Sequence, residues 1–137
     1  GIINAIVLLF RHALVVHGED GFDEISISAP TKVAEIKDGG IFESTITPEQ
    51  FGLPLAEKEE VVGGSPEENA LITQGILAGT IRDAKRNIVL LNAGCALYVV
   101  GQAGSIGDGV ALAAEMIDSG AALAKLEELK QFTNALA

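Results

Sequence analysis

Two kinds of hydrophobic pattern follow one another along this chain. The segment HALVV (residues 12–16) is a short apolar run rich in β-branched valine, which is typical of a strand buried on both faces. In DEISISAP (23–30), apolar and polar residues alternate with the period of a half-buried strand. In TKVAEIKDGGIFESTIT (31–47), two apolar segments flank Asp38-Gly39-Gly40, and glycine tolerates the positive φ that tight turns need. This third segment predicts a β-hairpin.

Helix start signals follow the strand pattern. TPEQFGLP (47–54) has threonine at the N-cap, proline at the first helical position and glutamine at the third, which is a capping-box pattern. Its glycine and second proline end this helix early. SPEENALITQGILAG (65–79) repeats the pattern with a serine cap and a glutamate at the third position. Leu71, Ile72 and Ile76 form one apolar face there, and the final glycine fits a C-terminal stop.

Three more helices are predicted in the remaining sequence. DAKRNIVLLNAGCALYVVG (83–101) is apolar nearly all round, which is typical of a central, buried helix. SIGDGVALAAEMI (105–117) begins with a serine cap, and SGAALAKLEELKQF (119–132) begins at Ser119 and carries a leucine stripe. Strands therefore come first and helices after. This order predicts an α/β architecture in which sheet strands and a β-hairpin are followed by covering helices.

Composition leaves two interpretations of the apolar residues open. The 137 residues suit one domain, and 48% of them are hydrophobic although only 4% are aromatic. The mean hydropathy of +0.37 is high for a soluble domain. Either these residues fill an α/β core, or part of the apolar surface packs against a partner or a missing domain. The opening segment GIINAIVLLF (1–10) is too short to span a bilayer and lacks the basic start of a signal peptide.

The net charge argues against some classes of binding partner. The net charge is −10 and the isoelectric point about 4.5, which argues against nucleic acid and against an anionic membrane surface. An anionic substrate therefore needs a cation, or basic groups from elsewhere, in order to bind. The single cysteine, Cys95, excludes an intrachain disulfide and lies in an apolar segment, so we expect a buried, inert thiol and a cytoplasmic protein.

The candidate chemistry is concentrated in one acidic turn. Four carboxylates fall within six residues there, namely Glu19, Asp20, Asp23 and Glu24. Crowded carboxylates repel each other, whereas a hard cation such as Mg²⁺ uses one or two of them together with water and phosphate oxygens. A metal would turn this cluster into an anchor for a phosphate. From the spacing alone, a solvated acidic loop is the simpler interpretation, and the spacing does not fit a calcium-binding EF-hand loop.

Other polar residues give weaker signals. His12 and His17 are five residues apart and have no second ligand pair, which argues against zinc. His17 either positions a substrate or hydrogen-bonds at a strand end. The turn Gly63-Gly64-Ser65 precedes a helix and offers free amides to an anion, but the glutamates that follow favour simple capping. No Ser/His/Asp set can be assembled from the sequence.

Five longer motifs follow one another along the chain, namely RHALVVHGEDGFDEIS, TKVAEIKDGGIFESTITPEQFGLP, GGSPEENALITQGILAG, RNIVLLNAGCALYVVG and IDSGAALAKLEELKQFTN. In this order they resemble the anthranilate phosphoribosyltransferase family. The resemblance covers the chain from about Arg11 to its end. It implies a fold like that of the pyrimidine nucleoside phosphorylases, with a small helical domain and a larger α/β domain. On this resemblance, residues 1–137 are expected to form the C-terminal part of the α/β domain.

The resemblance also implies a reaction. In the family, the amine of anthranilate displaces pyrophosphate from phosphoribosyl pyrophosphate in tryptophan synthesis, in a cytoplasmic homodimer that uses Mg²⁺. The adjacent Asp-Glu of the family's DGxDE motif binds that magnesium, and this carries over to Asp23 and Glu24. The family's glycine-rich phosphate motif, its Lys-His-Gly-Asn-Arg segment and the arginine that contacts anthranilate lie upstream of the matched region. The catalytic and substrate-binding residues, and the dimer contacts, are therefore expected outside this chain.

Two alternatives to this function stay open at the level of sequence. One is a related phosphorylase or phosphoribosyltransferase with another acceptor, because the groups that select the acceptor lie upstream in the family. The other is a non-catalytic binding or assembly module that keeps the fold. Light scattering separates the second from a part of an enzyme, because a defined monomer or oligomer favours a module and aggregation favours a part.

We predict that the purified 137-residue chain has no transferase activity by itself, because the family's phosphate and anthranilate motifs are not among its residues. Anthranilate consumption in the presence of phosphoribosyl pyrophosphate and Mg²⁺ measures this. Turnover above the rate without protein would contradict the prediction.

Overall fold

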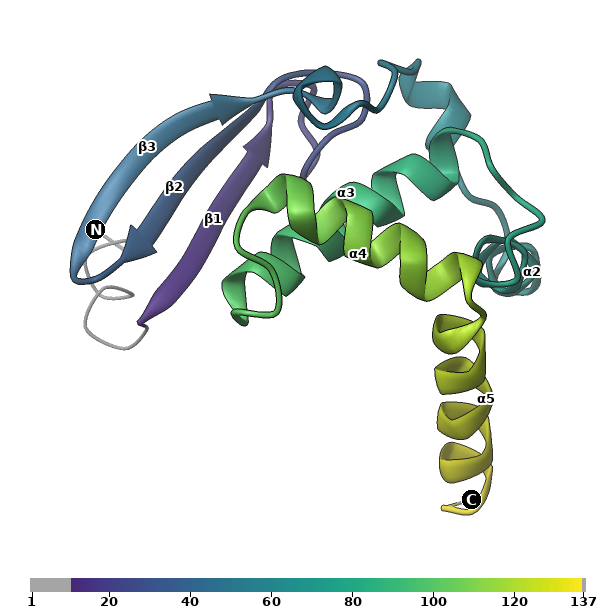
Figure 1. Cartoon of the computed structure of the whole chain (residues 1–137). Coiled ribbons are helices and arrows are strands. Elements are labelled where there is room, and N and C mark those ends of the chain that lie inside the picture. The colour runs from purple at the N-terminus through teal and green to yellow at the C-terminus, as the bar shows by residue number, and fades with distance from the viewer. Residues whose placement is uncertain (1–10, 137) are drawn as a thin grey trace.

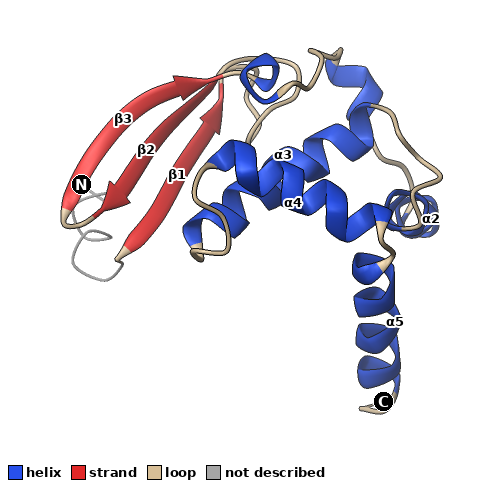
Figure 2. Ribbon diagram, viewed as in Figure 1, coloured by secondary structure: helices blue, strands red, loops and turns tan. Residues whose placement is uncertain are grey.

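A computed structural model of the chain describes residues 11–136. The expectation for the opening apolar segment, residues 1–10, lies outside the described residues. Within them, three strands form a sheet and a group of helices follows, so the predicted α/β architecture is confirmed (Figure 2). None of the helices in residues 11–136 is both long and apolar enough to cross a membrane.

The sheet is antiparallel, with strand order β1-β2-β3. Its strands are β1 (His12–Gly18), β2 (Thr31–Lys37) and β3 (Gly40–Ile46). In this register Leu14 lies opposite Glu35. Asp38 and Gly39 join β2 to β3 with φ angles of 51° and 77°, the pair of positive values that a tight two-residue hairpin turn requires. The predicted hairpin is confirmed.

Two details of the predicted strands are wrong. Strand β1 is half-buried along most of its length rather than buried on both faces, and within the described residues it lies at an edge of the sheet. Residues 23–30 form a loop instead of a strand, although Ile25 and Ile27 are both buried. The reason is that side chains take up the backbone hydrogen bonds of this segment: the amide of Ser26, for example, donates to the hydroxyl of Thr31 at 2.9 Å.

Two short 3₁₀ helices and four α-helices follow the sheet. The 3₁₀ helices are Pro48–Phe51 and Lys58–Val61. The α-helices are α2 (Pro66–Leu77), α3 (Ala84–Val99), α4 (Ile106–Asp118) and α5 (Ala121–Asn134). The expected serine caps are present on α2 and α4, where Ser65 and Ser105 accept from the third helical amide.

The expected start of the last helix is wrong. Ser119 ends α4 as its C-cap, and α5 begins after Gly120, whose φ is 81°. Glycine adopts this left-handed conformation without steric cost, so the chain can change direction sharply between the two helices. Helix α5 then projects away from the rest of the molecule, and none of its residues is buried (Figure 1).

Helices α3 and α4 lie side by side between the sheet and helices α2 and α5, and α3 contacts β1 (Figure 1). All residues of α3 except Ala96 are buried or half-buried, which confirms the prediction of a central helix. The core collects side chains from the loop after β1, from the segment after the first 3₁₀ helix, and from α2, α3 and α4. Its buried members are Ile25, Ile27, Leu53, Ile76, Leu90, Leu91, Cys95, Val110, Ala113 and Ile117.

The α3–α4 crossing is very close because glycines meet there. A Cβ built on Gly94 of α3 would lie 2.6 Å from the backbone nitrogen of Val110, and one built on Gly109 of α4 would collide with the carbonyl oxygen of Gly94. The obstructing atoms are backbone, which cannot rotate away. Side chains at these two positions would therefore push the helices apart.

We predict that Gly94→Ala and Gly109→Ala each lower the free energy of unfolding by about 1–3 kcal/mol, because overpacking at this crossing moves two backbones. Urea titration followed by circular dichroism measures the effect. Gly107→Ala is the matched control, since Gly107 lies in α4 with nothing nearer than 3.8 Å to its Cβ position. The control should be neutral or slightly stabilising. Equal destabilisation by all three variants would contradict the role given to the crossing.

Candidate functional site

The acidic turn lies in the loop that joins β1 to β2, residues 19–30. Its first part is a tight turn in which the amide of Gly18 donates to the carbonyl of Phe22 at 2.9 Å and Gly21 adopts a φ of 93°. Its ends are joined by the amide of Glu19, which donates to the carbonyl of Pro30 at 2.9 Å. The loop is therefore a defined structure that holds its carboxylates in fixed places.

Asp20 points into the loop and acts as an internal acceptor. Its carboxylate accepts from the hydroxyl of Ser26 at 2.6 Å, from the hydroxyl of Ser28 and from the amide of Phe22 at 3.3 Å. Partial burial alone would raise the pKa of Asp20. These hydrogen bonds stabilise the charged form more strongly, so its pKa lies below the ordinary value. The carboxylate of Asp20 therefore serves the loop rather than a ligand.

Glu19 also has a partner within the chain, the side chain of Lys32. Its carboxylate lies 3.6 Å from the ammonium of Lys32, at the start of β2, and both side chains are exposed. A second cation lies close to the loop, because the ammonium of Lys58 donates to the carbonyl of Asp20 at 2.9 Å and sits 4.7 Å from the centre of the Phe22 ring. Two of the four acids thus have structural or electrostatic partners.

The other two acids, Asp23 and Glu24, remain available. Both are exposed, and neither side chain makes a hydrogen bond or an ion pair with any other residue in the range 11–136. Partial burial, and then the neighbouring charge of Asp23, raise the pKa of Glu24. The structure therefore gives the four acids different surroundings. Asp20 accepts hydrogen bonds inside the loop, Glu19 pairs with a lysine, and the adjacent Asp23 and Glu24 pair with no basic side chain of residues 11–136.

This pair suits a hard divalent cation by the chemistry of its donors. Carboxylate oxygens are preferred ligands of Mg²⁺, which usually keeps several waters and shares oxygens with a bound phosphate. No cluster of three or more histidine, cysteine or acidic side chains in the described part of the chain could hold a metal ion. Two exposed carboxylates beside open solvent thus fit a magnesium ion whose remaining ligands are water and an anion, and they do not fit a closed structural metal site.

Asn92 holds the backbone immediately after the pair, and sequence reasoning missed it. Its carboxamide oxygen accepts from the amide of Ile25 at 3.0 Å, and its nitrogen donates to the carbonyl of Ile25 at 2.9 Å. The only signal in the sequence was an amide side chain inside the apolar run of α3. Nothing in the spacing indicated that this amide reaches a loop 67 residues away.

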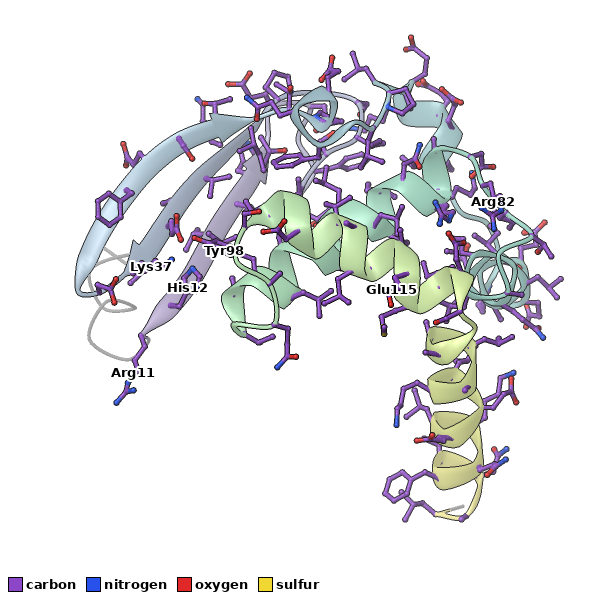
Figure 3. All side chains as sticks on the ribbon, in the orientation of Figure 1. Arg11, His12, Lys37, Arg82, Tyr98 and Glu115 are labelled. Atoms are coloured by element: carbon purple, nitrogen blue, oxygen red, sulfur yellow. The ribbon has the colours of Figure 1, made fainter. Side chains whose placement is uncertain are left out.

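The two histidines have different surroundings. His12 is hydrogen-bonded to Glu35 at 2.8 Å, and the hydroxyl of Tyr98 donates to the same carboxylate oxygen at 2.7 Å. Lys37 donates to that hydroxyl at 3.1 Å, which completes a polar cluster between the sheet and the end of α3 (Figure 3). His17 is exposed at the end of β1 and makes no hydrogen bond within the described residues.

Two further candidate groups, the Cys95 thiol and the amides before α2, are buried or already hydrogen-bonded within the chain. Burial raises the pKa of the Cys95 thiol to about 11, so the expected buried, inert thiol is confirmed. At the start of α2, the amide of Gly64 donates to Asn69 at 2.8 Å and that of Ser65 to Glu68 at 2.7 Å. The expected capping is therefore present, and these amides are not free to bind an anion.

Comparisons of sequence and of structure with known proteins find the same kind of enzyme. The profile of a glycosyl transferase family, a/b domain, matches residues 3–123. The anthranilate phosphoribosyltransferase of Methanobrevibacter smithii is 51% identical over 125 residues, which are 91% of this chain and 37% of that protein. This chain thus spans little more than a third of that relative.

Two solved structures share the fold. The crystal structure of anthranilate phosphoribosyltransferase from Thermus thermophilus superposes with a TM-score of 0.78 at 39% identity, over 85% of this chain and 34% of that one. The Saccharomyces cerevisiae enzyme in complex with PRPP and Mg superposes with a TM-score of 0.77 at 27% identity, over 85% of this chain and 33% of that one.

We predict that Asp20→Asn lowers the free energy of unfolding by about 1–2 kcal/mol at pH 7, because it weakens hydrogen bonds to a charged acceptor. The pKa of Asp20 is lowered on folding, so its stabilisation is complete above the unfolded pKa of about 4 and is lost as the pH falls through the folded pKa. The difference between variant and parent should therefore shrink below about pH 4. Urea titrations at pH 7 and pH 3 measure it.

Glu19→Gln is the control for Asp20→Asn. It removes a carboxylate from the same loop, but the ion pair that it breaks is exposed on both sides. Exposed pairs contribute at most about 1 kcal/mol, so this variant should change stability little at either pH. A pH-independent loss in Asp20→Asn would contradict the role of the carboxylate charge.

Proposed function

This chain belongs to the glycosyl transferase family, through its a/b domain, and on that premise we propose that it forms part of an anthranilate phosphoribosyltransferase and carries that enzyme's magnesium site. The reaction transfers the phosphoribosyl group of phosphoribosyl pyrophosphate to the amine of anthranilate and releases pyrophosphate. The observation that carries the proposal is the isolation of Asp23 and Glu24. Of the four acids of the loop, these two have no partner in residues 11–136, and they are the Asp-Glu of the DGxDE motif.

Magnesium, when bound, supplies positive charge that is shared with the oxygens of the diphosphate. The residues of this chain then have two tasks: they hold that cation, and they keep it on the exposed side of the loop. Asp23 and Glu24 provide the ligand oxygens, and the loop bonds of Asp20 keep the carboxylates on the exposed side. The chain itself carries a net charge of −10, so without a cation its own field repels a diphosphate.

The two parts of the proposal have different support. The metal pair is supported by the geometry of the loop and by the likeness to the yeast enzyme in complex with PRPP and Mg. Anthranilate as the acceptor is supported by the names of the relatives. We further propose, on the family resemblance, that the whole protein acts in tryptophan synthesis in the cytoplasm, as a homodimer whose contacts lie outside this chain.

A chimera tests the function without any assumption about the rest of the protein. In the Methanobrevibacter smithii enzyme, the matched 125 residues are replaced by those of this chain, which are 51% identical to them. We predict magnesium-dependent consumption of anthranilate. Asp23→Asn combined with Glu24→Gln should lower kcat/KM about 100-fold or more, because a bound metal contributes several kcal/mol of charge stabilisation.

The matched control in the chimera is Glu19→Gln, which removes an acid from the same loop but leaves the pair intact. It should keep most of the activity and an unchanged dependence on magnesium concentration. A doubly neutralised chimera that is folded by circular dichroism and retains full magnesium-dependent turnover would overturn the metal assignment. A chimera that binds magnesium and phosphoribosyl pyrophosphate but does not consume anthranilate would contradict the proposal that this chain can complete such an active site.

A further inference from the structure

We propose that Asn92 is a positioning residue for the carboxylate pair. Its carboxamide clamps the backbone of Ile25 and so fixes the direction in which Asp23 and Glu24 leave the loop. This inference rests on the proposed function, because it assigns the clamp to a pair that holds a cation. It adds a residue from α3, in the second half of the chain, to a site whose ligands lie near the start.

The clamp uses both polar atoms of one side chain on both polar atoms of one residue. The oxygen of Asn92 accepts from the amide of Ile25 at 3.0 Å, and its nitrogen donates to the carbonyl of Ile25 at 2.9 Å. This pairing copies the exchange of two hydrogen bonds between facing residues of an antiparallel sheet. Asparagine is short and carries one donor group and one acceptor group, so it can replace a neighbouring strand at a single position.

The orientation of the Asn92 amide is itself fixed by the helix. The same nitrogen also donates to the carbonyl of Ile88, one turn earlier in α3, at 3.0 Å. A carbonyl can only accept, so the nitrogen must face Ile88 and the oxygen must face the amide of Ile25. The reverse orientation would leave two acceptors facing each other. The clamp therefore has one stable geometry.

Both flanks of the pair are tied within the loop, but the pair itself is not. The turn before it is closed by the bond from Gly18 to Phe22, and the segment after it by the bond from Ser26 to Thr31. In the described part of the chain, the hydrogen bonds to the backbone of residues 23–25 come from Asn92. The clamp is thus the hydrogen-bonded connection between this backbone and the helices, beside the packing of the Ile25 side chain in the core.

The anchor that Asn92 provides is rigid. Its neighbour Leu91 is 1% exposed and Cys95 is 4% exposed, so this part of α3 is fixed by the core. Ile25, the residue held by the clamp, is 3% exposed. Two adjacent carboxylates repel each other and would separate in a free loop, which makes a shared cation harder to bind. A backbone anchored beside them reduces that separation before the cation arrives.

The test is the affinity of the chimera described above for Mn²⁺ alone, a paramagnetic substitute for Mg²⁺. Mn²⁺ broadens the amide signals of nearby residues in a ¹⁵N-correlated NMR spectrum, so a titration reports both the location and the dissociation constant. In the parent chimera, broadening in the segment from this chain should centre on Asp23 and Glu24. Asn92→Ala should raise that dissociation constant by about 10-fold, which is the range for residues that orient metal ligands.

Two further variants keep the test decisive. Asn92→Leu removes all three hydrogen bonds of the side chain but roughly keeps its volume, so it serves if the alanine variant loses its dispersed spectrum. Asn87→Ala is the matched control, because Asn87 lies in the same helix and its side chain makes no hydrogen bond within residues 11–136. The control should bind Mn²⁺ as the parent does. A merely structural role for Asn92 would lower the melting temperature of both Asn92 variants without moving the dissociation constant.

The outcomes separate the inference from the function on which it rests. Weaker Mn²⁺ binding in a folded Asn92 variant, with the control unchanged, supports the clamp. Binding within about twofold of the parent in a folded Asn92 variant overturns it and leaves the metal site intact, and an equal loss in Asn87→Ala also overturns it. If the parent shows no broadening at Asp23 and Glu24, the proposed metal site itself fails and the clamp has no function to serve.

Discussion

The burial of helix α3 is the constraint on which the other parts of the structure depend. The close approach of Gly94 and Gly109 lets α4 cover one side of it, and the sheet lies on another (Figure 1). Three separate regions are then attached to this one helix by polar side chains. Asn92 holds the loop after β1, Tyr98 reaches β2, and Lys85 donates to the carbonyl of Glu60 in the second 3₁₀ helix. A buried helix gives each of these attachments a fixed base.

The acidic loop shows how similar side chains acquire different tasks through their surroundings. Asp20 is surrounded by hydroxyl and amide donors, which stabilise its charge and use it to close the loop. Asp23 and Glu24 have no such donors among the described residues, and burial together with the neighbouring charge raises the pKa of Glu24. The loop thus places a hydrogen-bonded carboxylate inside and an adjacent pair without such donors outside. A cation that reached this pair would relieve a repulsion that the fold leaves uncompensated.

Much of the fold was predictable because its signals are local. The turn at Asp38-Gly39 and the serine caps at Ser65 and Ser105 need only neighbouring residues, and all were confirmed. Residues 23–30 were predicted as a strand and form a loop, because the bonds that shape them come from the loop itself and from Asn92, 67 residues away. Spacing could identify the acidic cluster, but it could not tell Asp20 from Asp23. Their difference depends on which of them meets the hydroxyls of Ser26 and Ser28.

The polar cluster of His12, Glu35, Lys37 and Tyr98 has a mechanical consequence (Figure 3). Tyr98 and Asn92 are six residues apart in α3, so about 9 Å of helix separates them. Tyr98 joins the helix to the sheet near the start of β1, and Asn92 joins it to the loop that follows that strand. Between these two attachments, Leu14 and Val16 of β1 pack against the core to which α3 contributes. The edge strand is therefore tied to the helix by polar contacts at both ends and by apolar contacts in between, and the loop that carries Asp23 and Glu24 continues from a strand that is held along its length.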